Sequence, residues 1–295
     1  METIEALRPT LAEICPETEE ELFWDTRLRS LYDHKIASPD GTDPDILSKY
    51  QGKVTLVFNC AAGCGNVPQH SVLKMLDERY ANEPDFNIQA IVVDDFTCHG
   101  YEEFNDGLEA YAENNKLDMT PGEVAENYAR VNFGSEYAFS ELTNGRFDKH
   151  NYDPDWVPGT QYEQEPHPFW LDITGAEGVP RNEQNLPHHY EESPWAAITQ
   201  VEDRSKPGFS PLKGNFEKFL IDRTGKRFHR YYNGFLLGQR GRHGAEFPWW
   251  YDGDDYAHLK EFYDTRNHGS WPSDMQRMGI DFSLDLISRD IDSLL

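Results

Sequence analysis

The sequence predicts an α/β fold in which helices flank a mixed central sheet, and three observations carry that prediction. Two apolar runs, at 53–58 and 88–93, have the β-branched content of strands buried on both faces. A helical pattern at 68–80 lies between them, which makes a βαβ unit with parallel pairing and a right-handed crossover. Two further apolar runs flank the turn at 223–226, which predicts an antiparallel hairpin over 215–232.

The chain opens on an acidic segment, 1–29, whose apolar residues recur at helical spacing. We expect a helical leader there and one domain over 30–295. The leader lacks the basic-then-apolar layout of a signal peptide, and no stretch approaches the run of about 18 apolar residues that spans a membrane. A cytoplasmic location without a membrane partner is therefore expected, with the four cysteines kept as reduced thiols.

Three more helices are expected beyond the second strand. The first covers 101–113, where four apolar and aromatic side chains fall on one stripe. The second begins at Pro121, a residue favoured in the first turn of a helix, and runs to Arg130. The last helix closes the chain with one apolar face, formed by Leu284, Ile287, Ile291 and Leu294. Parallel βαβ unit, helices, hairpin and terminal helix follow one another as they do in a thioredoxin-like fold.

Two segments interrupt this order. Residues 144–212 and 235–278 are rich in Pro, Gly, Asp and Trp and have little periodicity. We interpret both as irregular, aromatic-rich insertions, ordered by their aromatic side chains rather than by regular structure. Irregular loops on a rigid scaffold often carry new specificity, so the insertions are candidates for a lid over a substrate pocket.

The charge of the chain excludes one class of partner. With 27 basic and 53 acidic side chains, the formal net charge is −26. Such a charge opposes binding to nucleic acid and to anionic membrane surfaces. Aromatic residues make up 13% of the chain, which indicates a folded protein with an acidic surface rather than a disordered one.

The sharpest candidate for chemistry is Cys64, in the loop between the first strand and its helix. Unsatisfied amides and the helix dipole at a helix N-terminus favour the thiolate, and they can also hold a developing oxyanion or a peroxide oxygen. Gly63 and Gly65, on either side, let the backbone approach whatever Cys64 attacks. The sequence therefore predicts a nucleophilic or redox-active cysteine at this position.

Three segments, 31–70, 91–96 and 213–226, resemble the glutathione peroxidase family of the thioredoxin superfamily. The first contains KVTLVFNCAAGCGNVPQ, which resembles that family's reactive loop, and the last contains NFEKFLIDRTGK, which resembles its hairpin. The resemblance implies that Cys64 holds the position of the peroxidatic cysteine or selenocysteine. It likewise implies that Asn215 hydrogen-bonds the reacting centre.

The chain departs from that family's pattern at three places. Asp95 stands where the family has glutamine, Gly214 stands where it has tryptophan, and residues 128–133 hold no resolving cysteine. A carboxylate beside Cys64 would raise the pKa of the thiol by repelling the thiolate. A neutral Asp95 would instead donate a proton to the leaving oxygen. Asp95 is therefore expected either to restrain ordinary peroxidase chemistry or to mark a changed reaction.

A sulfenate formed on Cys64 must be resolved by another thiol. Cys98 is the candidate within the chain, because it follows the second parallel strand at the sheet edge where Cys64 lies. Cys60 is expected to pack inward at the end of its own strand. Otherwise an external reductant such as glutathione or thioredoxin completes the cycle.

A metal site is the alternative interpretation. Cys60, Cys64, Cys98 and His99 are soft ligands near one end of the sheet, and thiolate with imidazole suits copper or zinc. In that case the fold would use Cys64 for metal binding or for another thiol-centred reaction on a specific small molecule. An inactive redox fold kept as a binding module is a third interpretation.

The leading prediction is a thiol-dependent peroxidase without a resident cofactor. Its partners would be a small-molecule peroxide, either hydrogen peroxide or an organic hydroperoxide, and a thiol reductant. The catalytic residues would be Cys64, Asn215 and Asp95, with Cys98 as the candidate resolving thiol. The sequence leaves the oligomeric state open, a homo-oligomer included.

Overall fold

A computed structural model of the chain describes residues 30–64, 66–93, 104, 107–145, 166–173, 199–202, 212, 215–226, 228–231, 236 and 274–295. For 199–202, 274–279 and 282 it describes the backbone alone. The expected leader at 1–29 lies outside these residues, as do most of both insertions. The candidate residues Asp95, Cys98, His99 and Gly214 also lie outside them.

A mixed sheet of six strands forms the centre of the described chain, in the order β3-β2-β1-β5-β6-β4. The neighbours β1, β2 and β3 pair in parallel, whereas β5 pairs antiparallel with both β1 and β6, and β4 pairs antiparallel with β6. The predicted mixed sheet, with its parallel βαβ unit and its antiparallel hairpin, is confirmed. The strands are β1 Val54–Cys60, β2 Phe86–Val93, β3 Ala138–Thr143, β4 Thr199–Glu202, β5 Lys218–Ile221 and β6 Phe228–Tyr231.

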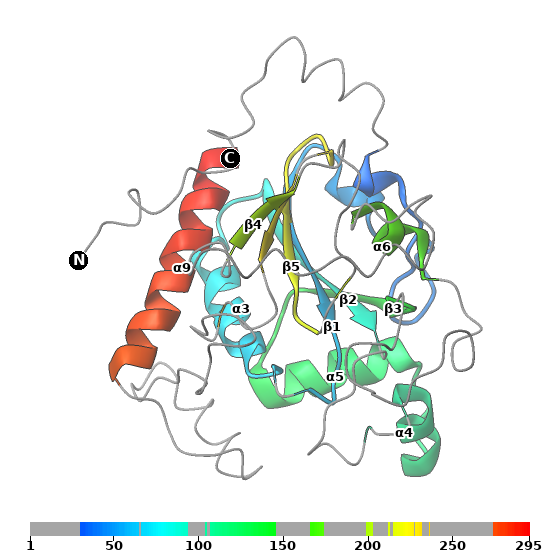
Figure 1. The fold of residues 1–295 in the computed structure, drawn as a ribbon. Helices are drawn as coiled ribbons and strands as arrows, with labels where there is room; N and C mark the ends of the chain where they lie inside the picture. Colours follow the sequence, from blue (N-terminus) through cyan, green and yellow to red (C-terminus); the bar gives the residue numbers. More distant parts are fainter. Residues whose placement is uncertain are drawn as a thin grey trace, which may run out of the picture.

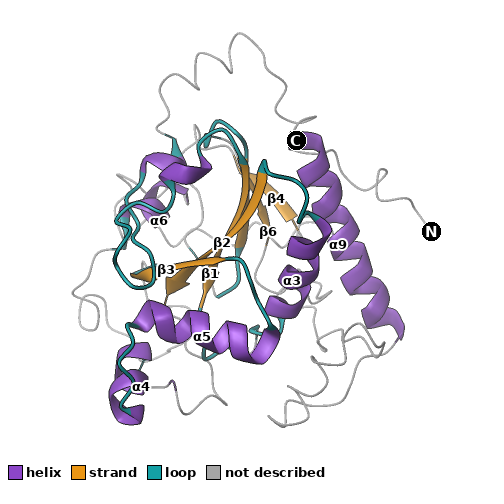
Figure 2. Cartoon of the chain, turned by 180° about the vertical axis from the view of Figure 1, so that it is seen from behind, coloured by secondary structure: helices purple, strands orange, loops and turns teal. Residues whose placement is uncertain are grey.

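Helices cover both faces of the sheet (Figures 1 and 2). One face carries α3 Gln69–Arg79, α4 Leu108–Asn115, α5 Pro121–Phe133 and α9 Asp274–Leu294, whose side chains share one apolar cluster with the strands. The other face carries the short 3₁₀ turns η2 Leu31–Asp33 and η3 Ser48–Tyr50 together with α6 Pro168–Ile173. The molecule is thus a three-layer α/β arrangement with the sheet in the middle.

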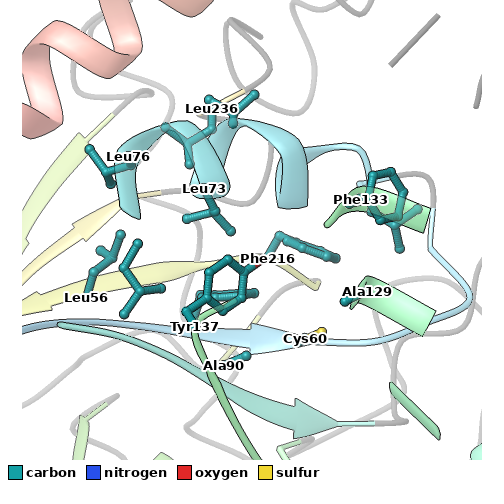
Figure 3. Packing of buried hydrophobic residues seen from close by; sticks show 14 of the residues in the cluster. Leu56, Cys60, Leu73, Leu76, Ala90, Ala129, Phe133, Tyr137, Phe216 and Leu236 are labelled. Atoms are coloured by element: carbon teal, nitrogen blue, oxygen red, sulfur yellow. The ribbon is translucent and has the colours of Figure 1, made fainter. Parts of the chain in front are cut away.

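The alternation of side chains along the strands divides the core in two. In β1, Leu56 and Phe58 belong to the cluster under α3, whereas Val57 belongs to the cluster under α6. Residues of opposite parity therefore point to opposite faces, as the pleat of a strand requires. Figure 3 shows the α3 side, where the rings of Tyr137 and Phe216 lie between the helix and the strands. This parity decides which polar side chains of β5 can reach the loop that holds Cys64.

Local signals explain where the helices begin and end. Thr120 and Glu123 form a capping box ahead of α5, and Pro121 occupies its first turn. Gly134 ends that helix with a φ of +65°, a left-handed conformation that glycine adopts without strain. Accordingly α5 continues three residues beyond the expected end at Arg130. The helix expected over 101–113 is described from Leu108 and runs to Asn115.

The structure corrects the interpretation of three segments. Strand β3 was not expected, because its sequence AFSELT lacks the apolar run of β1 and β2 and lies at the edge of the sheet. The first insertion is not wholly irregular, since α6 and β4 both lie within 144–212. The final helix starts at Asp274, inside the second expected insertion. The short elements β3, α6 and β4 carry too few residues for a periodic pattern to stand out.

Among the described residues, no helix combines the length and the hydropathy that crossing a membrane would require.

Candidate functional site

Cys64 lies in a tight turn between the end of β1 and the start of α3. The N–H of Val67 donates to the carbonyl of Cys64 at 3.1 Å, and the N–H of Gln69 donates to the carbonyl of Asn66 at 3.0 Å. The backbone N–H of Asn66 donates a hydrogen bond to Cys64 Sγ at 3.3 Å. The side chain is buried. The loop therefore directs a backbone amide at the sulfur, and an amide donor favours the thiolate over the thiol.

Asn215 is held at the same end of β1 by the residues that follow it. The Asn59 carbonyl accepts a hydrogen bond from the N–H of Phe216 at 2.7 Å, and Asn59 Oδ1 accepts one from the N–H of Glu217 at 2.8 Å. Phe216 has a φ of +65°, a left-handed conformation that is uncommon for a residue with a side chain. Backbone in such a conformation is retained where surrounding contacts demand it, and it is concentrated at functional sites.

Lys218 is a charged residue of the site that the sequence analysis missed. Its side chain is fully buried, and Nζ donates a hydrogen bond to Oε1 of Gln69, the first residue of α3. Burial holds the pKa of the amine well below its ordinary range, and the charges of Glu217 and Cys64 oppose that shift. A buried lysine therefore lies on the same face of the sheet as the candidate nucleophile.

The sequence contains a signal that could have revealed Lys218. In the run from Phe216 to Leu220, every second residue faces α3, so Lys218 occupies an inward position between two apolar side chains. A lysine at such a position is rarely buried without a role or a partner. The resemblance directed attention to Asn215 in the same segment, and Lys218 was treated as part of the hairpin.

A buried ion pair lies on the opposite face of the sheet from Lys218. Arg230 of β6 donates through Nε to Glu217 Oε2 at 2.8 Å and donates through its terminal nitrogen to the same oxygen. The Arg230 guanidinium also stacks over the ring of Phe219, 5.2 Å from its centroid. Because Glu217 and Lys218 are neighbours in a strand, their side chains point to different faces. The carboxylate of Glu217 is therefore engaged by Arg230 on the side away from α3.

Cys60 takes part in a separate buried chain of polar groups under α3. Its Sγ lies 3.6 Å from His70 Nε2, and Nδ1 of His70 contacts the hydroxyl of Tyr137. Burial raises the pKa of the Cys60 thiol, and it lowers the pKa of His70 to about 3. Both groups are consequently neutral near pH 7. Cys60 lies in the core, as its place at the end of a strand predicted (Figure 3).

The metal interpretation finds no ligand set in this part of the molecule. Within the described ranges, no group of three or more His, Cys, Asp or Glu side chains is arranged to hold a metal ion. Cys60 and Cys64 are both buried there. Cys98 and His99, the other two residues of that hypothesis, lie outside the described residues, as does Asp95.

Sheet order and site together define a class of protein: a thioredoxin-like fold with a buried cysteine between the first strand of its βαβ unit and the following helix. Two curated relatives are similar over most of their length. A glutathione peroxidase homologue of Neisseria meningitidis is 23% identical over 208 residues, which cover 68% of this chain and 89% of the relative. The glutathione peroxidase homologue BsaA of Staphylococcus epidermidis is 22% identical over 204 residues, which cover 69% of this chain and 89% of the relative.

Among solved structures, that of Trgpx in its apo form is 20% identical, with a TM-score of 0.37, and covers 70% of this chain and 86% of its own. No protein-family model matches the sequence. The chain is therefore similar, at 22–23% identity over about two thirds of its length, to proteins named as glutathione peroxidase homologues.

Proposed function

We propose that the chain is a thiol-dependent peroxidase whose nucleophile is Cys64. The thiolate attacks the terminal oxygen of hydrogen peroxide or of an organic hydroperoxide, so that an S–O bond forms and the O–O bond breaks. The sulfur loses two electrons and becomes a sulfenic acid, and the leaving oxygen takes up a proton as water or an alcohol. The observation that carries the proposal is the amide of Asn66 donating to Cys64 Sγ, in a loop between β1 and α3.

The surrounding residues have distinct roles in this proposal. Asn215, held near the end of β1 through its neighbours Phe216 and Glu217, hydrogen-bonds the reacting centre. A neutral Asp95 donates a proton to the leaving oxygen, whereas an ionised Asp95 repels the thiolate of Cys64. The sulfenic acid is reduced by Cys98, which would form a disulfide with Cys64 and release water, or by an external thiol such as glutathione or thioredoxin. A reducing cytoplasm would supply that external thiol.

Intact mass spectrometry during titration with hydrogen peroxide and with an organic hydroperoxide tests the proposal. We expect one oxygen per chain, or one disulfide, to form in stoichiometric amount. Cys64→Ser should abolish it. Cys60→Ser is the matched control, because burial raises the pKa of that thiol and keeps it protonated, so its loss is expected to leave the oxidation unchanged. An unreactive Cys64 would contradict the proposal.

Two further variants separate the roles around Cys64. Cys98→Ser should convert a disulfide product into a trapped sulfenic acid if Cys98 is the resolving thiol, and should change nothing if the reductant is external. Asp95→Gln restores the residue type of the resembled family. It should accelerate oxidation if the carboxylate restrains the thiolate, and slow it if Asp95 donates the proton.

A further inference from the structure

Lys218 and Cys64 come from two different elements and lie on the same face of the sheet. Lys218 pairs in register with Phe58 of β1 and with Tyr231 of β6, and both of those side chains belong to the cluster under α3. Cys64 belongs to that cluster too. The Lys218 amine extends to Gln69, five residues after Cys64, where it bonds the side-chain oxygen. The amine is therefore anchored at the helix end of the loop that carries the thiol.

Burial makes the charges of these two groups depend on each other. An isolated thiolate or an isolated ammonium ion is strongly disfavoured in an apolar core, so neither group ionises readily alone. If the proton of the Cys64 thiol passes to the Lys218 amine, two opposite charges form together and the net charge of the core is unchanged. Their mutual attraction in a medium of low polarity offsets part of the desolvation.

We propose that Lys218 accepts the proton of Cys64 and serves as the counter-charge that stabilises its thiolate. The exchange converts Cys64–SH and Lys218–NH₂ into Cys64–S⁻ and Lys218–NH₃⁺. This inference rests on the proposed function in taking Cys64 as the reactive thiol. When the thiolate attacks a peroxide, the proton held at Nζ is the one that the leaving oxygen needs, so the thiol, amine and peroxide yield sulfenic acid, amine and alcohol or water in balance.

Three other polar or charged residues of the described chain lie next to Lys218 in sequence, in register or by a hydrogen bond. Glu217, on the same strand, is bound by Arg230 on the opposite face, and it acts on Lys218 only at a distance. Gln69, from α3, is neutral. The hydroxyl of Tyr231, from β6, donates to Asp290 of α9. We therefore take Cys64 as the group on the α3 face whose loss of a proton accompanies the gain of one by Lys218.

The test is the pH dependence of Cys64 alkylation by iodoacetamide in the full-length protein, read by peptide mass spectrometry from about pH 5 to about pH 10. Lys218→Met should move the midpoint of thiolate formation upward by about one to three pH units, since an opposite charge shifts a pKa by that amount. Methionine is an apolar residue of similar length, so the fold should be kept. Lys74→Met, on the exposed side of α3, removes the same charge and should leave the midpoint unchanged.

A second variant keeps the inference testable if Lys218→Met does not fold. Lys218→Arg carries a permanent charge, so the midpoint should stay at the wild-type value or fall below it. Coincident midpoints for Lys218→Met and wild type, or a higher midpoint for Lys218→Arg, would overturn the inference. So would a wild-type Cys64 that is not alkylated anywhere in the range. A shifted midpoint together with no reaction toward peroxide would leave the ion pair standing and contradict the peroxidase proposal instead.

Discussion

The side-chain oxygen of Asn59 accepts a hydrogen bond from the backbone N–H of Glu217 at 2.8 Å, which joins the end of β1 to the start of β5. Two backbone bonds between Asn59 and residues 216–217 accompany it. This short ladder holds Asn215 and Lys218 at the end of the strand from which the Cys64 loop begins. The site is therefore assembled across two strands that lie far apart in the sequence.

Asn59→Ala should loosen this connection. The substitution leaves the buried N–H of Glu217 without its side-chain acceptor, which costs about 1–3 kcal/mol in the free energy of unfolding. Urea denaturation measures that loss, and oxidation of Cys64 by peroxide should slow as well. Asn87→Ala in β2 is the matched control: within the described chain the amide nitrogen of Asn87 has no hydrogen-bond partner, so its loss should be smaller. Equal losses for the two variants would contradict the positioning role of Asn59.

Glu217→Gln should destabilise the fold strongly, because it removes the negative charge that pairs with the buried Arg230 guanidinium. Breaking a buried ion pair from one side typically costs about 3–5 kcal/mol. The double variant Glu217→Leu with Arg230→Met removes both charges, and it should recover most of that loss because apolar residues of similar volume tolerate burial. Denaturant titration of the three proteins gives the comparison. A double variant no more stable than Glu217→Gln would show that the pair is needed for more than charge balance.

Sequence reasoning could predict the parts of the site that depend on neighbouring residues. It missed those that depend on contacts between residues far apart in the sequence. Cys64 was identified because its chemistry depends on local order, a strand followed by a loop and a helix. Asn215 came from the resemblance. Lys218 and Gln69 interact across 149 positions of sequence, and no local pattern encodes that contact.

The same reasoning explains the elements that were missed. The strands β1 and β2 have continuous apolar runs because both faces are covered, whereas the edge strands β3 and β4 have mixed sequences. Strand β4 pairs with β6, although β5 lies between them in the sequence and the paired residues are about 30 positions apart. Periodicity within a short segment cannot show such a pairing.

The buried His70 should make stability depend on pH in a defined window. Its pKa is about 3 in the folded chain, against an ordinary value of 6.5, so the unfolded chain binds the proton first. The free energy of unfolding should therefore fall as the pH drops from 6.5 toward 3, by roughly 1 kcal/mol per pH unit from this group. His70→Phe removes that contribution, since a phenyl ring does not titrate.

Thermal or urea unfolding of wild type and His70→Phe between about pH 7 and pH 5 measures the effect before most carboxylates protonate. The stability of wild type minus that of His70→Phe should decrease as the pH falls. Parallel curves over that interval would contradict a neutral, buried His70. His167→Phe is a comparison in which the imidazole is less buried, and its effect on the slope should be weaker.

The last prediction concerns the docking of the C-terminal helix. The hydroxyl of Tyr231 donates to Asp290 Oδ2 at 2.6 Å, and His229 Nδ1 lies 3.5 Å from the same oxygen. Both the tyrosine and the aspartate are buried, so Tyr231→Phe withdraws a donor from a carboxylate that water does not reach. A lost hydrogen bond to a charged group costs about 1.5–3 kcal/mol.

Because the contact joins β6 to α9, the loss should be concentrated at that helix. Hydrogen exchange should accelerate in 283–294 and remain unchanged in β1 and β2, whose amides pair within the sheet. Tyr80→Phe offers the matched control: its hydroxyl also reaches α9, at Asp292, but that carboxylate lies at the surface, where water replaces the lost donor. Faster exchange throughout the sheet in Tyr231→Phe would mean that α9 does not open separately from the core but unfolds together with it.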